Sequence, residues 1–143
     1  MQRISRYGLT GLASTLSLGM AVVRADVVAV VSSNSPITTL TKSQVMDIFL
    51  GRRTHFPDGS SAIPIDQAEG SPAREEFYAR CAGMSSAQVK AYWSRIIFTG
   101  RGQPPASVAT GLEARKLLSA NLNSIGYIEQ SLVDSSVRVV LAP

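Results

Sequence analysis

The segment from Asp66 to Arg74 has the clearest capacity for chemistry in this sequence. Ser71 is followed by Pro72 and two acidic residues, a pattern typical of the first turn of a helix. A helix start offers N–H groups without intrahelical partners and the positive end of a dipole, and Ser71 adds a hydroxyl. These groups would bind a small anion without any covalent step. The same residues are equally consistent with a plain helix cap and a solvated Arg74, so both interpretations stay open.

The sequence offers little for catalysis or for metal binding. His55 is the single histidine and Cys81 the single cysteine, and no Gly-x-Ser-x-Gly motif accompanies them. A catalytic triad or a structural metal site would need more of these residue types together. Glu75 and Glu76 match the dipole of a first helical turn better than an acid–base pair. We therefore expect no enzyme, no metal site and no cofactor. Cys81 is expected to be a buried small hydrophobe, with a thiol that links the protein to a partner as the weaker alternative.

The N-terminal residues have the pattern of a secretory signal peptide. A start with two arginines precedes an apolar run over residues 9–23, and a Val-Arg-Ala end suits cleavage after Ala25. The run is shorter than the ~20 residues that a membrane span needs, so an uncleaved anchor is the weaker alternative. We expect residues 1–25 to be removed and residues 26–143 to form a single domain in the periplasm.

Charge excludes one class of partner. The full chain has a net charge of +4, but three arginines and no acids lie in the expected leader, so the mature chain would carry about +1. No block of lysines and arginines remains, and no basic stretch is interleaved with aromatic residues. Nucleic-acid binding is therefore not expected.

The first half of the mature chain predicts two strands and a helix between them. Residues 26–31 are continuously apolar and β-branched, as in a strand covered on both faces. Thr41 and Gln44 form a capping-box pattern that starts a helix over residues 42–50. Residues 62–66 predict a second strand, in which Pro64 indicates a sheet edge or a strand end because proline cannot donate to a ladder.

The second half predicts three helices and then two strands. A helix should run from Ser71 to Gly83, and the next begins at Ser85 with an apolar stripe at helical spacing, formed by Val89, Tyr92, Trp93, Ile96 and Ile97. The Gly- and Pro-rich residues 98–105 break that helix. A fourth helix is predicted over residues 108–120, with strands over residues 125–128 and 137–141. Strands separated by helices indicate an α/β domain with a mixed, partly parallel sheet flanked by helices.

Several motifs in this order resemble the phosphate-binding proteins of ABC importers, in the type II periplasmic-binding-protein superfamily. The motifs are Ile48-Phe49 with Gly51, the Gly59 loop, Ile63 to Asp66, Ser71 to Phe77, Trp93, Phe98 with Gly100, and Ile125-Gly126-Tyr127. In that family two α/β lobes close on an anion. The resemblance implies that this chain is a single lobe, without the other one. The aromatics Phe49, Trp93, Phe98 and Tyr127 are expected to be core residues rather than ligand contacts.

The resemblance also implies a function. It predicts an exported, non-catalytic receptor or accessory of an ABC uptake system, binding phosphate or a similar oxyanion through Ser71, the N–H of Ala73 and Arg74. The resemblance places an arginine in this segment, whereas this chain has Asp66, which would repel phosphate unless Arg74 or an opposing arginine compensates.

A single lobe would enclose only one side of a bound anion, and the expected partners are those that could enclose the other side. An ABC permease, another envelope protein or a second copy in a homodimer would supply the other half. The alternative is a periplasmic protein-interaction module that kept the lobe and lost ligand binding.

Overall fold

The computed structural model describes residues 17, 19 and 26–143, so the predicted leader lies almost entirely outside the described residues. The strands are β1 (Val27–Ser32), β2 (Ile63–Gln67), β3 (Ala106–Val108), β4 (Ser124–Glu129) and β5 (Val137–Leu141). The helices are α1 (Lys42–Phe49), α2 (Pro72–Ala82), α3 (Ser86–Phe98) and α4 (Gly111–Ala120), with a 3-10 turn at Gln130–Leu132. None of the described helices is long and apolar enough to cross a membrane.

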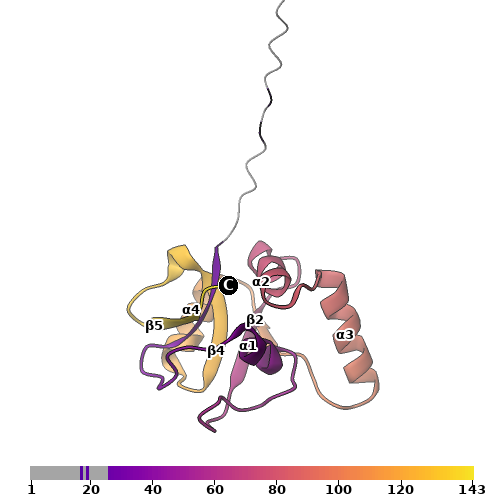
Figure 1. Ribbon diagram of the computed structural model, residues 1–143, viewed down its shortest axis with the longest axis horizontal. Helices are drawn as coiled ribbons and strands as arrows, with labels where there is room; N and C mark the ends of the chain where they lie inside the picture. The colour runs from indigo at the N-terminus through magenta and orange to yellow at the C-terminus, as the bar shows by residue number, and fades with distance from the viewer. Residues whose placement is uncertain (1–16, 18, 20–25) are drawn as a thin grey trace, which may run out of the picture.

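The five strands form one mixed sheet in the order β3-β2-β4-β1-β5. β1 is antiparallel to β4 and β5, whereas β2 is parallel to both β3 and β4. α3 lies at the opposite end of the molecule from β5 (Figure 1). The predicted mixed sheet flanked by helices is therefore confirmed.

Two apolar clusters lie on opposite faces of this sheet. The larger cluster packs α1, α2 and α3 onto alternate residues of β1 such as Ala29 and Val31. The smaller cluster packs α4 onto the other set of alternate residues of β1, Val28 and Val30. Since both faces of β1 are covered, the strand is buried along its whole length, which explains its continuously apolar sequence.

Local signals placed α1 correctly. Thr41 Oγ1 accepts a hydrogen bond from the Gln44 N–H at 3.1 Å, and Gln44 Oε1 accepts one from the Thr41 N–H at 2.9 Å. Gly51 follows α1 with φ +71°, and a β-carbon there would lie 3.1 Å from the Trp93 ring. Only 6% of Trp93 is exposed, so its predicted place in the core is confirmed.

One sequence-based expectation about the elements is wrong. Residues 106–108 form a strand parallel to β2, so the fourth helix begins at Gly111 and not at residue 108. Pro64 lies near the start of β2, before residues 65–67 that pair with β3, so of its two predicted places, a sheet edge or a strand end, the strand end is confirmed. The sequence did not reveal β3 because the strand has three residues and follows a proline-rich stretch.

Two side chains differ from their expected burial. Phe98 is 92% exposed, because α3 packs through Val89 and Trp93 and its last residue extends past the core. Cys81 is only half-buried, at the margin of the larger cluster. Burial raises the pKa of the Cys81 thiol to about 11, despite the opposing effect of nearby Lys42 and Arg80.

Candidate functional site

Three parallel strands end at the same edge of the sheet. β2 is followed by α2 and β3 by α4, and these helices cover opposite faces. Connections that leave neighbouring parallel strands toward opposite faces open a crevice beyond the carboxyl ends of the strands. In this protein the crevice is a cleft of about 390 Å³, which we term the strand-end cleft. Its polar lining comes from Gln67, Ser71, Ala73, Thr110, Gly111 and Glu129.

The start of α2 forms one side of the strand-end cleft. Ser71 caps the helix, its Oγ accepting a hydrogen bond from the Arg74 N–H at 3.3 Å. The hydroxyl hydrogen of Ser71 remains available for donation. Pro72 carries no N–H, and the Ala73 N–H has no backbone or side-chain acceptor among residues 26–143. This side therefore presents one hydroxyl, one free N–H and the positive end of the α2 dipole.

The start of α4 forms the opposite side. Thr110 caps this helix through a 3.2 Å hydrogen bond from the Glu113 N–H to its Oγ1. A β-carbon at Gly111 would lie 2.8 Å from Leu132 Cδ1 and 3.2 Å from Glu129 Oε2. Only glycine allows this approach, which brings the Glu129 carboxylate, at the end of β4, against the first turn of α4.

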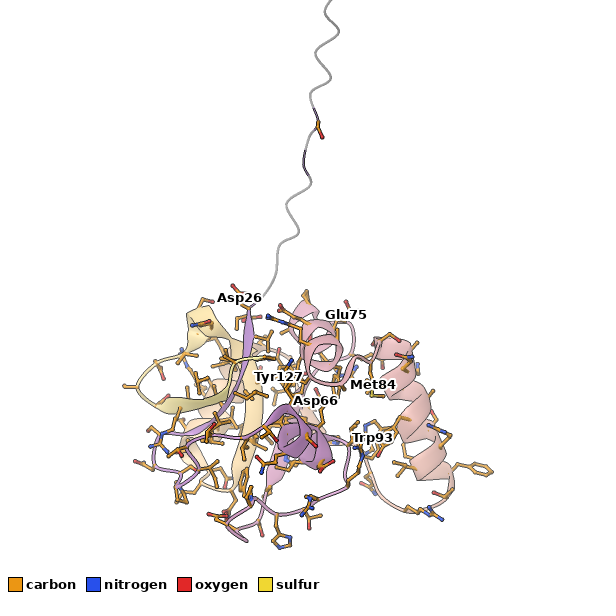
Figure 2. All side chains as sticks on the ribbon, in the orientation of Figure 1. Asp26, Asp66, Glu75, Met84, Trp93 and Tyr127 are labelled. Atoms are coloured by element: carbon orange, nitrogen blue, oxygen red, sulfur yellow. The ribbon has the colours of Figure 1, made fainter. Side chains whose placement is uncertain are left out.

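The structure separates the four predicted ligand-binding residues into two pairs. Ser71 and Ala73 line the strand-end cleft, whereas Asp66 and Arg74 are not among its lining residues. The Asp66 carboxylate lies in the interior near Tyr127 (Figure 2). Arg74 Nε lies 3.5 Å from Asp66 Oδ1, and the guanidinium carbon lies 5.3 Å from the centroid of the Tyr78 ring.

Asp66 is the centre of a buried hydrogen-bond network. Its carboxylate accepts hydrogen bonds from the Tyr78 hydroxyl at 2.7 Å, from the Tyr127 hydroxyl, and from the Gln67 N–H at 2.8 Å. Burial, and then the Asp66 charge, raise the pKa of both phenols well above the usual tyrosine range. The phenols therefore stay protonated and continue to donate to Asp66 at any ordinary pH.

Three cleft residues did not emerge from the sequence as candidates: Gln67, Thr110 and Glu129. Thr110 is a cap-type residue followed by Glu113 at the capping-box distance, but the helix was predicted to begin before it. Gln67 and Glu129 each end a strand, and strand ends are local features. What the sequence does not show is that β2 and β4 are parallel neighbours, which places both ends at one edge.

A second cleft, of about 430 Å³, lies between α1 and the loop that contains His55. Arg53 is among its lining residues, and Asp47 holds that arginine at 3.7 Å and Arg52 at 3.1 Å. The arginine of this cleft is therefore already paired with a carboxylate, which it shares with Arg52 outside the cleft. The strand-end cleft, with its free donors, is the better candidate for a ligand.

Comparison with known proteins gives matches of structure only. No protein-family model matches the chain, and no curated protein matches it. A putative phosphate ABC transporter substrate-binding protein from Clostridium perfringens, solved with bound phosphate, is similar with a TM-score of 0.63 and 23% identity. The match covers 82% of this chain and 46% of that protein.

Other solved structures give the same result. An ABC-type phosphate transport receptor from Vibrio cholerae has a TM-score of 0.63 and 20% identity, over 80% of this chain and 45% of the receptor. PstS from Borrelia burgdorferi has a TM-score of 0.53 and 13% identity, over 80% of this chain and 46% of its own. The chain thus spans about half the length of these proteins and has the fold of that half.

Proposed function

We propose that this protein is an exported, non-catalytic binding protein that holds phosphate or a similar oxyanion in the strand-end cleft, as a receptor or accessory of an ABC uptake system. The observation that carries the proposal is the free donor set at the start of α2, the Ser71 hydroxyl and the Ala73 N–H. A helix start with a free N–H, a cap hydroxyl and the positive end of the dipole is an established arrangement for oxyanions. The similar fold of proteins named as phosphate receptors supports the same ligand class.

A cleft that covers one side of an anion leaves the other side in water, where charge-assisted hydrogen bonds are screened. We therefore expect weak binding by the isolated chain. A second protein surface would complete the shell, supplied by a second copy of the chain, an ABC permease or another envelope protein. Crosslinking in cells, with and without the ligand, would identify which of these partners contacts the strand-end cleft.

Export is part of the proposal and has its own test. The charged start and the Val-Arg-Ala end support cleavage after Ala25. Mass spectrometry of the protein from a periplasmic fraction should find a chain that begins at Asp26. A chain that keeps residues 1–25, or that stays with the membranes, would contradict export as proposed.

A matched pair of cap variants tests ligand binding. Ser71→Ala and Ser85→Ala each remove an N-cap hydroxyl and should each cost about 0.5–2 kcal/mol of stability. Only Ser71 lines the strand-end cleft. Phosphate or sulfate at 100 times its dissociation constant should stabilise the wild type and Ser85→Ala by about 2.7 kcal/mol, and Ser71→Ala by less. Thermal melting and calorimetry measure both effects.

One surface feature favours the alternative function, a protein-interaction module. Phe98 and Ile97 expose an apolar surface at the end of α3, far from the strand-end cleft. If no oxyanion changes the melting curve or releases heat, the receptor proposal fails. The interaction function would then be supported by Phe98→Ser abolishing a crosslinked partner while leaving the melting temperature unchanged.

A further inference from the structure

We infer that the preferred ligand of the strand-end cleft is a small zwitterion, which carries an oxyanion group and a primary ammonium. The inference rests on the proposed function, because the oxyanion group occupies the donor set at the start of α2. The further inference concerns the other group of the ligand, the ammonium. That group is recognised by two acceptors, Glu129 and Gln67, on the side of the cleft that faces α4.

The Glu129 carboxylate lines the cleft without a cation of its own. Within residues 26–143 no lysine or arginine forms an ion pair with it, and its carboxylate accepts no hydrogen bond there. Arg115, on the same helix that Glu129 faces, is engaged elsewhere: its Nε lies 3.4 Å from Asp134, and its Nη1 donates to the Leu132 carbonyl at 2.8 Å. A carboxylate in a ligand cleft without a cation favours a ligand that brings one.

Gln67 supplies an independent second acceptor. The residue is only 3% exposed, and its Nε2 donates to the Tyr127 carbonyl at 2.8 Å, which fixes the orientation of the amide. Oε1 receives no hydrogen bond from residues 26–143 and keeps some exposed surface, and Gln67 is one of the residues that line the cleft. An amide oxygen that accepts nothing from the protein is free to accept a hydrogen bond from a bound ligand.

Glu129 and Gln67 are close together. A β-carbon at Gly111 would lie 3.2 Å from Glu129 Oε2 and 3.8 Å from Gln67 Nε2, so both side chains converge on the first turn of α4. An ammonium group has three donors and no acceptor, so it can donate to the Glu129 carboxylate and, with another hydrogen, to the oxygen of the neighbouring Gln67 amide. Phosphate carries only negative charge to this side of the cleft, where Glu129 disfavours it.

The cleft therefore has two poles. The α2 pole offers donors through Ser71 and Ala73, and the α4 pole offers acceptors through Gln67 and Glu129. Aminoalkylphosphonates, phosphate monoesters of small amino alcohols and small amino acids all carry the complementary pair of groups. A volume of about 390 Å³ accommodates any of them.

Calorimetry with two ligands that differ only in the ammonium group tests the inference. We expect the exported protein to bind aminomethylphosphonate about tenfold more tightly than methylphosphonate, as one charge-assisted hydrogen bond provides. In Glu129→Gln the ratio of the two dissociation constants should fall to about one. Glu113→Gln is the matched control. It removes a carboxylate from the same helix start, one that already accepts from the Ala109 N–H, and should keep the tenfold ratio.

The outcomes separate this inference from the function on which it rests. Equal affinity for both ligands in the wild type overturns the zwitterion and leaves oxyanion binding standing. A ratio that persists in Glu129→Gln also overturns it, because the ammonium is then recognised elsewhere. If neither ligand, nor phosphate, binds the wild type, the proposed function and this inference fail together.

Discussion

Asp66 and Glu129 are two carboxylates at the carboxyl ends of neighbouring parallel strands, yet their surroundings are opposite. Asp66 is 3% exposed and is bonded to two phenols, a backbone N–H and an arginine. Glu129 is partly exposed and has none of these partners within the described part of the chain. One carboxylate thus organises the core beneath the cleft, and the other is left for the cleft itself.

The alternation of β2 explains why Asp66 faces the core. Ile65 packs with the α4 cluster, so the next residue points to the opposite face, beneath α1 and α2. There the Phe77 ring stacks on Tyr127 with centroids 4.0 Å apart, and only 3% of Asp66 is exposed. A charge in such surroundings is tolerated only when its partners satisfy it.

The largest expected contrast is in stability after truncation to alanine. Asp66→Ala leaves the Tyr78 and Tyr127 hydroxyls buried without an acceptor and Arg74 without its counter-ion. We expect a loss of about 3–5 kcal/mol in the free energy of unfolding, as for other broken buried pairs. Glu129→Ala should cost less than about 1 kcal/mol. Urea denaturation of both variants measures the difference, and equal losses would erase the contrast between the two carboxylates.

Alkaline pH should lower the free energy of unfolding through the two phenols that donate to Asp66. The pKa of Tyr78 and of Tyr127 is raised in the folded state by burial and by Asp66. Above the unfolded-state pKa of about 10, only the unfolded chain releases these protons, so the free energy of unfolding falls as pH rises. The expected slope is about 1.4 kcal/mol per pH unit for each phenol.

Tyr127→Phe distinguishes this network from general alkaline denaturation. The variant should lose on the order of 1 kcal/mol at pH 7, because Asp66 loses one donor. Between pH 10 and 11 its stability should then fall less steeply, by the contribution of about one proton. Denaturant titrations across this pH range measure the slope. An unchanged slope would mean that Tyr127 ionises in the folded protein, and that its hydrogen bond to Asp66 does not keep the phenol protonated.

Local rules were sufficient for the helix starts that begin with a clear cap. Thr41 with Gln44, Ser71 with Pro72, and Ser85 all act within four residues of sequence, and each cap is present in the structure. Apolar periodicity likewise placed Trp93 in the core. Ser71 and Ala73 were identified for the same reason: the chemistry of a helix start is contained in its first turn.

The rest of the candidate site depends on contacts between distant residues. Asp66 meets the Tyr127 hydroxyl across 61 positions of sequence, so its inward orientation could not be read from its neighbours. Glu129 reaches the start of α4 only because β4 returns beside β2. Because β3 was not predicted, the start of α4 was placed too early, and Thr110 could not be recognised as part of the cleft.

The smallest expected effect concerns Glu129→Gln without ligand. Its carboxylate lies at the first turn of α4, where a negative charge interacts favourably with the helix dipole, an effect of about 0.3–1 kcal/mol at low salt. Neutralisation should therefore cost no more than this, and the loss should shrink in 1 M sodium chloride, where the Debye length is about 3 Å. Urea denaturation at low and high salt measures it. A loss above about 2 kcal/mol that resists salt would give Glu129 a structural role like that of Asp66, and the α4 pole of the cleft would then have no free carboxylate to offer a ligand.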